Sequence, residues 1–231
     1  KKLTSMVEYL IGVIRPDGLM PQFGDADDGR IHIFTKFGSW TPQDARHLLV
    51  PAGLLLDRPE WCPLGGEEGL WEAAWWGQDI SLVADDAAAA PENCTLYPQA
   101  GHAVVRKNGT YLLMCNGIVG TKGFGNHKHN DQLSFEFHAD GQPLLVDPGS
   151  YVYTSDPDAR NLFRGTGYHN TLIIDGEEQN ELRPDWLFRL FETAEATHVE
   201  FEVAEGHVDY QGKHIGYQRL ESGVVHDRRF R

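Results

Sequence analysis

The sequence of 231 residues contains few cysteines and no long apolar run. Its three cysteines, Cys62, Cys94 and Cys115, are too few and too widely spaced for a disulfide framework or a cysteine-based zinc site. A membrane-spanning helix needs about 20 consecutive apolar residues, and no segment approaches that length. We therefore expect no membrane span, and a fold that is stabilised by a hydrophobic core.

Positive charge is also scarce. Lys and Arg total 20 against 34 Asp and Glu, which gives a formal net charge of −14 at pH 7. A chain of this charge repels DNA and anionic membranes, so we expect no nucleic-acid partner. If the substrate is itself an anion, a local group of cations has to act against the overall field.

The first 92 residues have the pattern of helices. Apolar residues recur every three or four positions from Leu3 to Ile14, as on one face of a helix. Thr41, followed by a proline and an acidic residue, predicts the start of a helix over residues 41–57. A further helix is expected over residues 67–76. The alternation typical of strands is not seen in this part of the sequence.

The remaining residues have the pattern of β-strands. Two short apolar runs flank Asn108-Gly109, a pair typical of a two-residue hairpin turn. Alternation from Leu133 to Phe137, before a turn at Asp140-Gly141, predicts a second hairpin. Further strands are expected over 171–174, 198–204 and 216–220. Many short strands with Gly and Asn turns favour an antiparallel β-sandwich, so we expect an α+β fold with domains 1–92 and 93–231.

Two histidines lie two positions apart just before the predicted strand at Leu133. In extended backbone, His127, His129 and Asp131 would share one face with that leucine. Such a polar trio at the mouth of an apolar face is costly to bury unless a metal ion or a substrate satisfies it. The segment is therefore the strongest candidate for a functional site.

Two later residues complete a possible metal site. The hairpin through Asp140-Gly141 would bring Asp147 close to His129, and His169 precedes another predicted strand. Two histidines and a carboxylate with an open position suit zinc. The alternative is that the two histidines are merely a polar strand start.

These residues resemble the heparinase II/III-like family of polysaccharide lyases, which includes alginate and oligoalginate lyases. The resemblance is strongest over residues 120–180. It implies the C-terminal end of an α/α toroid followed by an antiparallel β-sandwich. The matching elements are His127-Lys128-His129-Asn130-Asp131, Val146-Asp147-Pro148-Gly149, Arg160, Arg164, Tyr168-His169-Asn170-Thr171, Asp175-Gly176 and the segment from Gly24 to Arg30.

The resemblance also implies a cofactor and an activity. The zinc ligands would be His129, Asp147 and His169, and His127 would face the substrate and take part in catalysis. Members of the family cleave a glycosidic bond by β-elimination next to a uronic acid. This reaction needs a neutralised carboxylate, a base for the C5 proton and an acid for the leaving oxygen.

The resemblance further implies that part of the catalytic machinery lies outside this chain. The catalytic Tyr and a second essential His are expected in the toroid, before residue 1. We therefore interpret the chain as an internal fragment and expect it to be inactive by itself. The family resemblance implies a periplasmic or secreted protein.

Basic and aromatic side chains are the candidates for contact with an anionic polysaccharide or oligosaccharide. Arginine forks match carboxylates in a bidentate way, and a surface ion pair is the alternative for each cation. Trp71 and Trp75 are four apart on a helix, so we expect core packing rather than stacking on sugars. The candidate cations are Lys128, Arg160, Arg164 and Arg30.

Other functions stay open at this point. A cupin-like metal enzyme also uses two histidines on a strand, but needs a Glu about three or four residues later, whereas the first one here is Glu136. A glycoside hydrolase would need a carboxylate pair across a cleft. The non-enzymatic alternative is a glycan-binding or exopolysaccharide-pathway sandwich. A calcium loop at Asp25–Gly29 is disfavoured because its distal Glu is missing.

Overall fold

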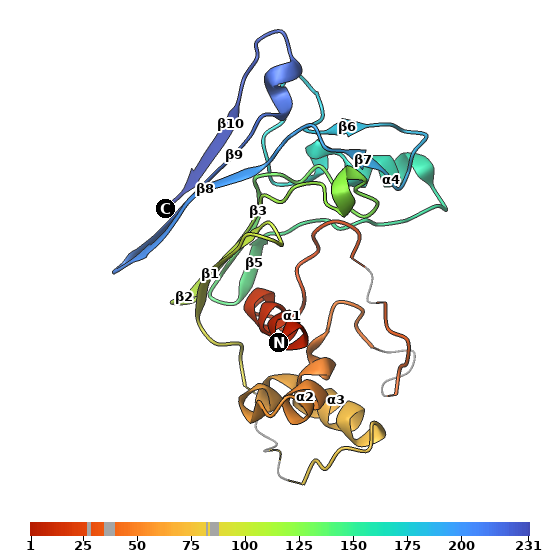
Figure 1. The fold of residues 1–231 in the computed structure, drawn as a ribbon, viewed down its shortest axis with the longest axis vertical. Coiled ribbons are helices and arrows are strands. Elements are labelled where there is room, and N and C mark those ends of the chain that lie inside the picture. The colour runs from red at the N-terminus through yellow and green to blue at the C-terminus, as the bar shows by residue number, and fades with distance from the viewer. Residues whose placement is uncertain (27–28, 35–39, 82, 84–87) are drawn as a thin grey trace. The chain divides into compact units, whose positions relative to one another are not determined.

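The computed structural model describes residues 1–26, 29–34, 40–81, 83 and 88–231. It divides into two compact units (Figure 1). The first comprises Lys1–Pro21 and Asp27–Pro91, and the second comprises Gln22–Ala26 and Glu92–Arg231. The short segment Gln22–Ala26 thus belongs with the C-terminal unit, although the sequence placed it within the helical part.

Within its described residues, the first unit contains three α-helices. These are α1 (Lys2–Val13), α2 (Leu49–Leu55) and α3 (Cys62–Trp75), with 3-10 turns at Arg46–Leu48 and Pro59–Trp61. The predicted helix over residues 41–57 therefore starts later than expected. One hydrophobic core cluster of the first unit consists of Val7, Ile11, Ile14, Leu49, Trp61 and Leu64.

The prediction that Thr41 caps a helix is wrong. The residue whose side chain contacts the start of the 3-10 turn is Asp44. The carboxylate of Asp44 accepts a hydrogen bond from the backbone N–H of Arg46 at 3.1 Å and also binds the Arg46 guanidinium. Residues 41–44 form a turn, in which Asp44 N donates to the Thr41 carbonyl. The contact between Asp44 and the N–H of Arg46 is a local side-chain turn, and neither the 3-10 turn nor α2 has a side-chain hydrogen bond at its N-cap.

The expectation that Trp71 and Trp75 pack in the core is also wrong. Their side chains are 54% and 63% exposed. The buried side of α3 instead carries small residues, and a Cβ added at Gly69 would lie 2.6 Å from a methyl carbon of Val50. Ala73, one turn further along, is fully buried. Close packing of α2 on this small-residue side leaves the two indoles on the outside.

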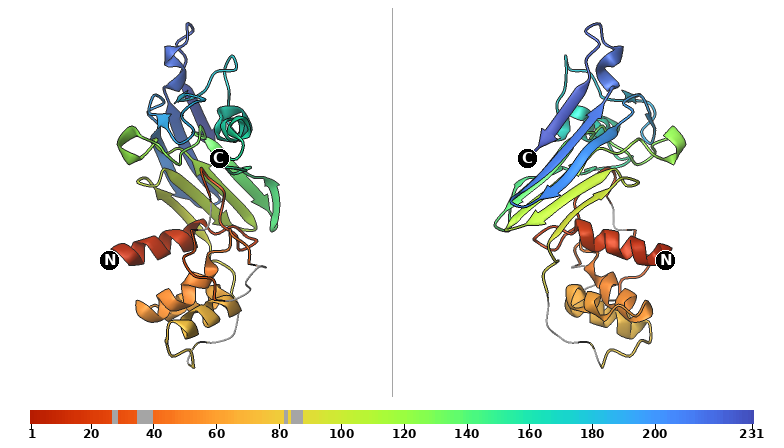
Figure 2. Two further views of the ribbon diagram at one scale, coloured as in Figure 1. Left: turned by 90° about the vertical axis from the view of Figure 1, so that its right-hand side faces the viewer. Right: turned by 60° about the vertical axis from the view of Figure 1, so that its left-hand side comes forward.

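The second unit contains two main antiparallel sheets (Figure 2). The first has the order β1-β2-β3-β4-β5, and the second has the order β10-β9-β8. A small hairpin and one helix, α4 (Pro157–Arg164), complete the unit. The strands are β1 (Asn93–Tyr97), β2 (His102–Lys107), β3 (Thr110–Cys115), β4 (Ser134–Ala139), β5 (Gln142–Leu145), β6 (Glu181–Leu182), β7 (Leu190–Phe191), β8 (Thr197–Ala204), β9 (His207–His214) and β10 (His226–Phe230).

Both predicted hairpins are confirmed. Lys107 pairs with Thr110 across the first turn, where Asn108 and Gly109 have φ values of 50° and 76°. Both values match the type I′ geometry for which Asn-Gly is suited. The second hairpin joins β4 to β5 through Asp140-Gly141, with Ala139 opposite Gln142.

Two predicted strands are wrong. Within residues 171–174 the structure has only an isolated bridge, between Ile174 and Glu177. Residues 216–219 form a 3-10 turn, in which the Tyr217 hydroxyl reaches the carbonyl of Leu172 at 2.8 Å. Tyr217 is fully buried in this turn, whereas Leu172 and Ile173 remain 45% and 40% exposed.

The two main sheets share one hydrophobic core. Tyr210 of β9 and Phe230 of β10 pack with Met114 of β3 and Phe135 of β4. The rings of Phe135 and Phe230 lie 5.2 Å apart in an edge-on arrangement. The fold of the described residues is therefore a mixture of helices and antiparallel sheets. None of the described helices is both long enough and apolar enough to cross a membrane.

Candidate functional site

The histidine-rich segment is a compact loop rather than the start of a strand. Strand β4 begins only at Ser134, whose N–H donates to the carbonyl of Asp131. Leu133 has a φ of +57°, which breaks the extended geometry just before the strand. The prediction that His127, His129 and Asp131 lie on one strand face is therefore wrong.

Polar contacts from residues distant in sequence hold this loop. The Asn130 amide donates to Glu178 at 2.6 Å, and the Asn130 oxygen accepts from the N–H of Asn180 at 3.1 Å. The backbone N–H of Gln132 donates to Gln179 at 2.9 Å. These buried bonds replace the ladder hydrogen bonds that an extended segment would make.

A buried carboxylate, Asp25, lies at the centre of the site. It accepts hydrogen bonds from Nδ1 of His127 at 3.0 Å and from Nε2 of His129 at 2.9 Å. Both terminal nitrogens of Arg160 donate to it, at 2.6 and 2.7 Å. Burial opposes ionisation of Asp25, but the hydrogen bonds from His129, Arg160 and His127 outweigh it, so its pKa lies well below the usual value.

The ring of His127 is the exposed member of this cluster. Its side chain is 59% exposed, whereas Asp25 has no exposed surface. The ring meets Phe188 edge-on at 6.4 Å. It borders a pocket of about 330 Å³ that is also lined by Phe23, Lys128 and Asp131. This histidine is thus held at one nitrogen and open to the pocket.

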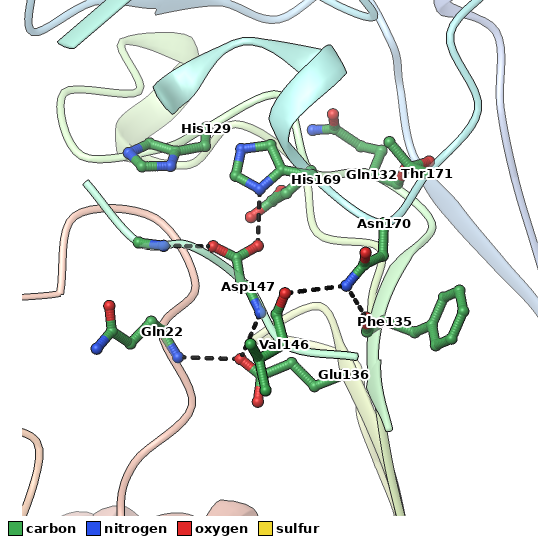
Figure 3. Close-up of polar contacts among 12 residues, drawn as sticks. Gln22, His129, Gln132, Phe135, Glu136, Val146, Asp147, His169, Asn170 and Thr171 are labelled. Carbon is green, nitrogen blue, oxygen red and sulfur yellow. Dashed lines mark hydrogen bonds and ion pairs between the residues drawn. The ribbon is translucent and has the colours of Figure 1, made fainter. Parts of the chain in front are cut away.

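His129, Asp147 and His169 lie together beside the end of β5 (Figure 3). The rings of His129 and His169 are 5.4 Å apart, and Nδ1 of His169 donates to Asp147 at 2.7 Å. The β4–β5 hairpin positions Asp147, as the sequence predicted, and its N–H contacts Glu136 at 3.4 Å. Burial lowers the pKa of His129, whereas for His169 the Asp147 carboxylate outweighs burial and raises it.

The donor atoms in this group suit a metal ion, although the ligands are not assembled. In the described part of the chain, no three His, Cys, Asp or Glu side chains stand ready to hold a metal. However, Nδ1 of His129, Nε2 of His169 and one oxygen of Asp131 are buried and have no hydrogen-bond partner among the described residues. Unsatisfied imidazole nitrogens beside carboxylates are the atoms that zinc binds.

The four predicted substrate contacts lie in different surroundings. Lys128 lines the pocket and forms an ion pair with the buried Asp131. Burial opposes the charge on Lys128, but the Asp131 carboxylate outweighs it and raises the pKa of the lysine. Arg30 is in the first unit, where it lies 3.7 Å from Glu72. Only Lys128 among the four therefore borders the pocket.

Arg160 and Arg164 are buried and bound by protein groups. Arg160 contacts Asp25 and the carbonyl of Leu187. Arg164 donates to Asn161 and to two backbone carbonyls. Each is 1% exposed. This arrangement offers neither guanidinium to a glycan, so we assign both to holding the loops around the site.

The sequence reasoning missed the central role of Asp25. The sequence offered Asp25 only as part of a disfavoured calcium loop, because its partners are more than 100 positions away. The only available signal was the resemblance of the segment from Gly24 to Arg30. Glu136, the first glutamate after the two histidines, accepts hydrogen bonds from the backbone N–H groups of Gln22 and Asp147.

Comparison with solved structures shows the fold of the chain. A heparinase III with methylated lysines superposes with a TM-score of 0.63 at 20% identity, covering 97% of this chain and 29% of that one. A heparan sulfate lyase mutant from Pedobacter heparinus gives a TM-score of 0.62 at 19% identity, with the same coverages. The chain thus spans about three-tenths of the length of these structures.

Comparison with protein families identifies the family of the chain. None of the curated proteins compared with the chain matches it. Residues 89–231 match the family described as heparinase II/III-like, C-terminal. That match covers more than half of the sequence and includes the loop, Asp147 and His169. The chain belongs to the heparinase II/III-like family.

Proposed function

We propose that the chain is part of a polysaccharide lyase that cleaves a uronate-containing glycan by β-elimination. The observation that carries this proposal is the arrangement of His127. One nitrogen of its ring donates to a buried carboxylate, and the ring faces a pocket of about 330 Å³. A histidine held in this way can take or give a proton at a defined position. The family relationship and the heparinase-like fold support the reaction class.

The chain's own residues would each perform one part of this reaction. His127 contacts the substrate and moves a proton, with Nε2 as the available atom. Lys128 would be the cation nearest to the anionic sugar, and it also forms an ion pair with Asp131. Phe188, edge-on to His127, limits the movement of the ring. Phe23 and Ile118 supply apolar surface for a sugar face in the same pocket.

We further propose that this site takes zinc, with His129, Asp147 and His169 as ligands. Two buried imidazole nitrogens without a hydrogen-bond partner among the described residues, next to a carboxylate, support this assignment. When bound, the ion would supply positive charge close to the anionic substrate. The electrostatic potential at the site would then be positive, although the net charge of the chain is −14.

The remaining catalytic groups are proposed to come from elsewhere in the protein. The chain spans about three-tenths of the heparinase structures it resembles. We propose that residues 1–92 are the end of an α/α toroid, and that the toroid supplies the catalytic Tyr and a second His. The chain alone would then be inactive, and the full-length lyase would act on an anionic polysaccharide in the periplasm or outside the cell.

Metal analysis tests the zinc proposal. We expect about one zinc ion per purified chain, and loss of the metal in the variants His129→Ala and Asp147→Ala. His207→Ala is the matched control, because this histidine lies on β9 and pairs with Asp209 at 3.5 Å, outside the proposed ligand group. A folded wild-type chain that binds no zinc would contradict the proposal.

A further inference from the structure

Asp25 connects the candidate proton-transfer residue to a candidate metal ligand. One oxygen of its carboxylate accepts from His127 and the other accepts from His129. Arg160 contacts the same two oxygens. All of these contacts converge on a side chain without exposed surface. A single buried group therefore determines the orientation of both imidazole rings.

The contacts also determine which nitrogen of each ring carries the proton. An ionised carboxylate can only accept hydrogen bonds, so the contacted ring nitrogen must be the donor. For His127 the donor is Nδ1, which leaves the lone pair on Nε2. For His129 the donor is Nε2, which leaves the lone pair on the buried Nδ1, beside the ring of His169. In their neutral forms the two rings are thus opposite tautomers.

Arg160 holds Asp25 in place. Its third guanidinium nitrogen donates to the carbonyl of Leu187 at 3.2 Å. Its guanidinium carbon lies over the rings of Tyr153 and Phe188, at 5.1 and 4.5 Å from their centroids. The bidentate contact therefore holds the carboxylate in one plane, and it also stabilises the ionised form of Asp25.

We propose that Asp25 is a positioning residue that holds His127 and His129 in opposite tautomers and thereby couples metal affinity to the orientation of the proton-transfer ring. The metal and activity parts of this inference rest on the proposed function, whereas the tautomers do not. Carboxylates that bind the far nitrogen of a metal-ligating histidine typically change metal affinity by about 10- to 100-fold. Asp25 has this position relative to His129.

The tautomers can be measured without any substitution of Asp25. Long-range ¹H–¹⁵N spectra of the metal-free chain distinguish a proton on Nδ1 from one on Nε2. The variants His127→Gln and His129→Gln assign the two rings by the signals that disappear. We expect Nδ1–H for His127 and Nε2–H for His129. Either ring in the other tautomer would overturn the inference.

Zinc affinity provides the second test. Competition with a chromogenic chelator should show zinc affinity about 10- to 100-fold weaker in Asp25→Asn than in the wild type. Asp227→Asn is the matched control, because Asp227 is exposed on β10 and contacts Gln211. We expect its affinity to be that of the wild type. Wild-type affinity in a folded Asp25→Asn protein would overturn the inference.

A double variant that removes both charges is the control for misfolding. Asp25→Asn alone leaves the buried Arg160 without its carboxylate, so the double variant Asp25→Asn/Arg160→Gln removes both charges. We expect the same loss of zinc affinity from it, and unchanged affinity would again contradict the inference. If the wild type binds no zinc, the proposed function fails at its metal site, and the tautomer measurement still decides the role of Asp25.

Discussion

At the residue scale, the proposed chemistry depends on how each imidazole is held. His127 donates from Nδ1 and is open to the pocket, whereas His129 donates from Nε2 and is buried. The spacing of the two histidines identified both residues, and the family resemblance implied their separate roles. It could not show that Asp25 joins them, because a contact over more than 100 positions leaves no local periodicity or spacing.

Substitution of His127 should separate catalysis from folding. In the full-length protein, we expect His127→Ala to lower kcat by about 10²- to 10⁴-fold, the usual contribution of a positioned acid or base. The free energy of unfolding should change little because the ring is more than half exposed. Absorbance of the unsaturated product measures the first quantity, and urea denaturation measures the second. His207→Ala should leave both unchanged. Full activity in His127→Ala would contradict the assigned role.

At the element scale, the hairpins were predictable and the loops were not. Asn108-Gly109 and Asp140-Gly141 determine their turns through backbone preferences that a few residues carry. The segment before β4 was misassigned because its shape depends on buried contacts from residues 178–180. Similarly, the exposure of Trp71 follows from how α2 packs on the far side of α3, which spacing alone does not show.

The first hairpin gives a direct stability test. Gly109 has a φ of +76°, and an added Cβ would lie 2.7 Å from a carboxylate oxygen of Asp140. We expect Gly109→Ala to lower the free energy of unfolding by about 1 kcal/mol, because Ala is strained in this conformation. Gly167→Ala is the control, because its φ is ordinary and its nearest neighbour lies at 4.0 Å. Equal denaturation midpoints for the two variants would contradict this explanation of the turn.

A pair of buried histidines makes the second sheet sensitive to acid. His214 of β9 and His226 of β10 lie with ring nitrogens 3.0 Å apart. Burial lowers their pKa values to about 3 and about 4, with Arg228 adding to the effect on His226. The folded chain therefore binds fewer protons than the unfolded chain between about pH 6.5 and pH 4.

This difference predicts how stability depends on pH. The free energy of unfolding should fall as the pH drops through that window, by about 1.4 kcal/mol per pH unit for each extra proton that the unfolded chain binds. Denaturation at pH 7, 6 and 5 measures the slope. We expect the double variant His214→Gln/His226→Gln to have a shallower slope, and His207→Gln to retain the wild-type slope. An unchanged slope in the double variant would show that the pair does not titrate in this way.

At the scale of the whole molecule, the net charge bears on which substrates the proposed function allows. The net charge of −14 argued against nucleic acid and left an anionic glycan dependent on local positive charge. Lys128 lines the pocket, whereas Arg160 and Arg164 are engaged within the fold, and the proposed zinc would add to the positive charge of Lys128. The chain divides into two compact units, and Gln22–Ala26 belongs with the second.

The production of unsaturated uronate tests the central claim most directly. The full-length protein should be incubated with heparin, heparan sulfate, alginate and bacterial exopolysaccharides, while ultraviolet absorbance and new reducing ends are both recorded. Elimination creates a double bond for each bond broken, whereas hydrolysis creates none. The account predicts that absorbance and reducing ends rise together on at least one of these polymers, and that both disappear in His127→Ala. New reducing ends without absorbance would contradict it.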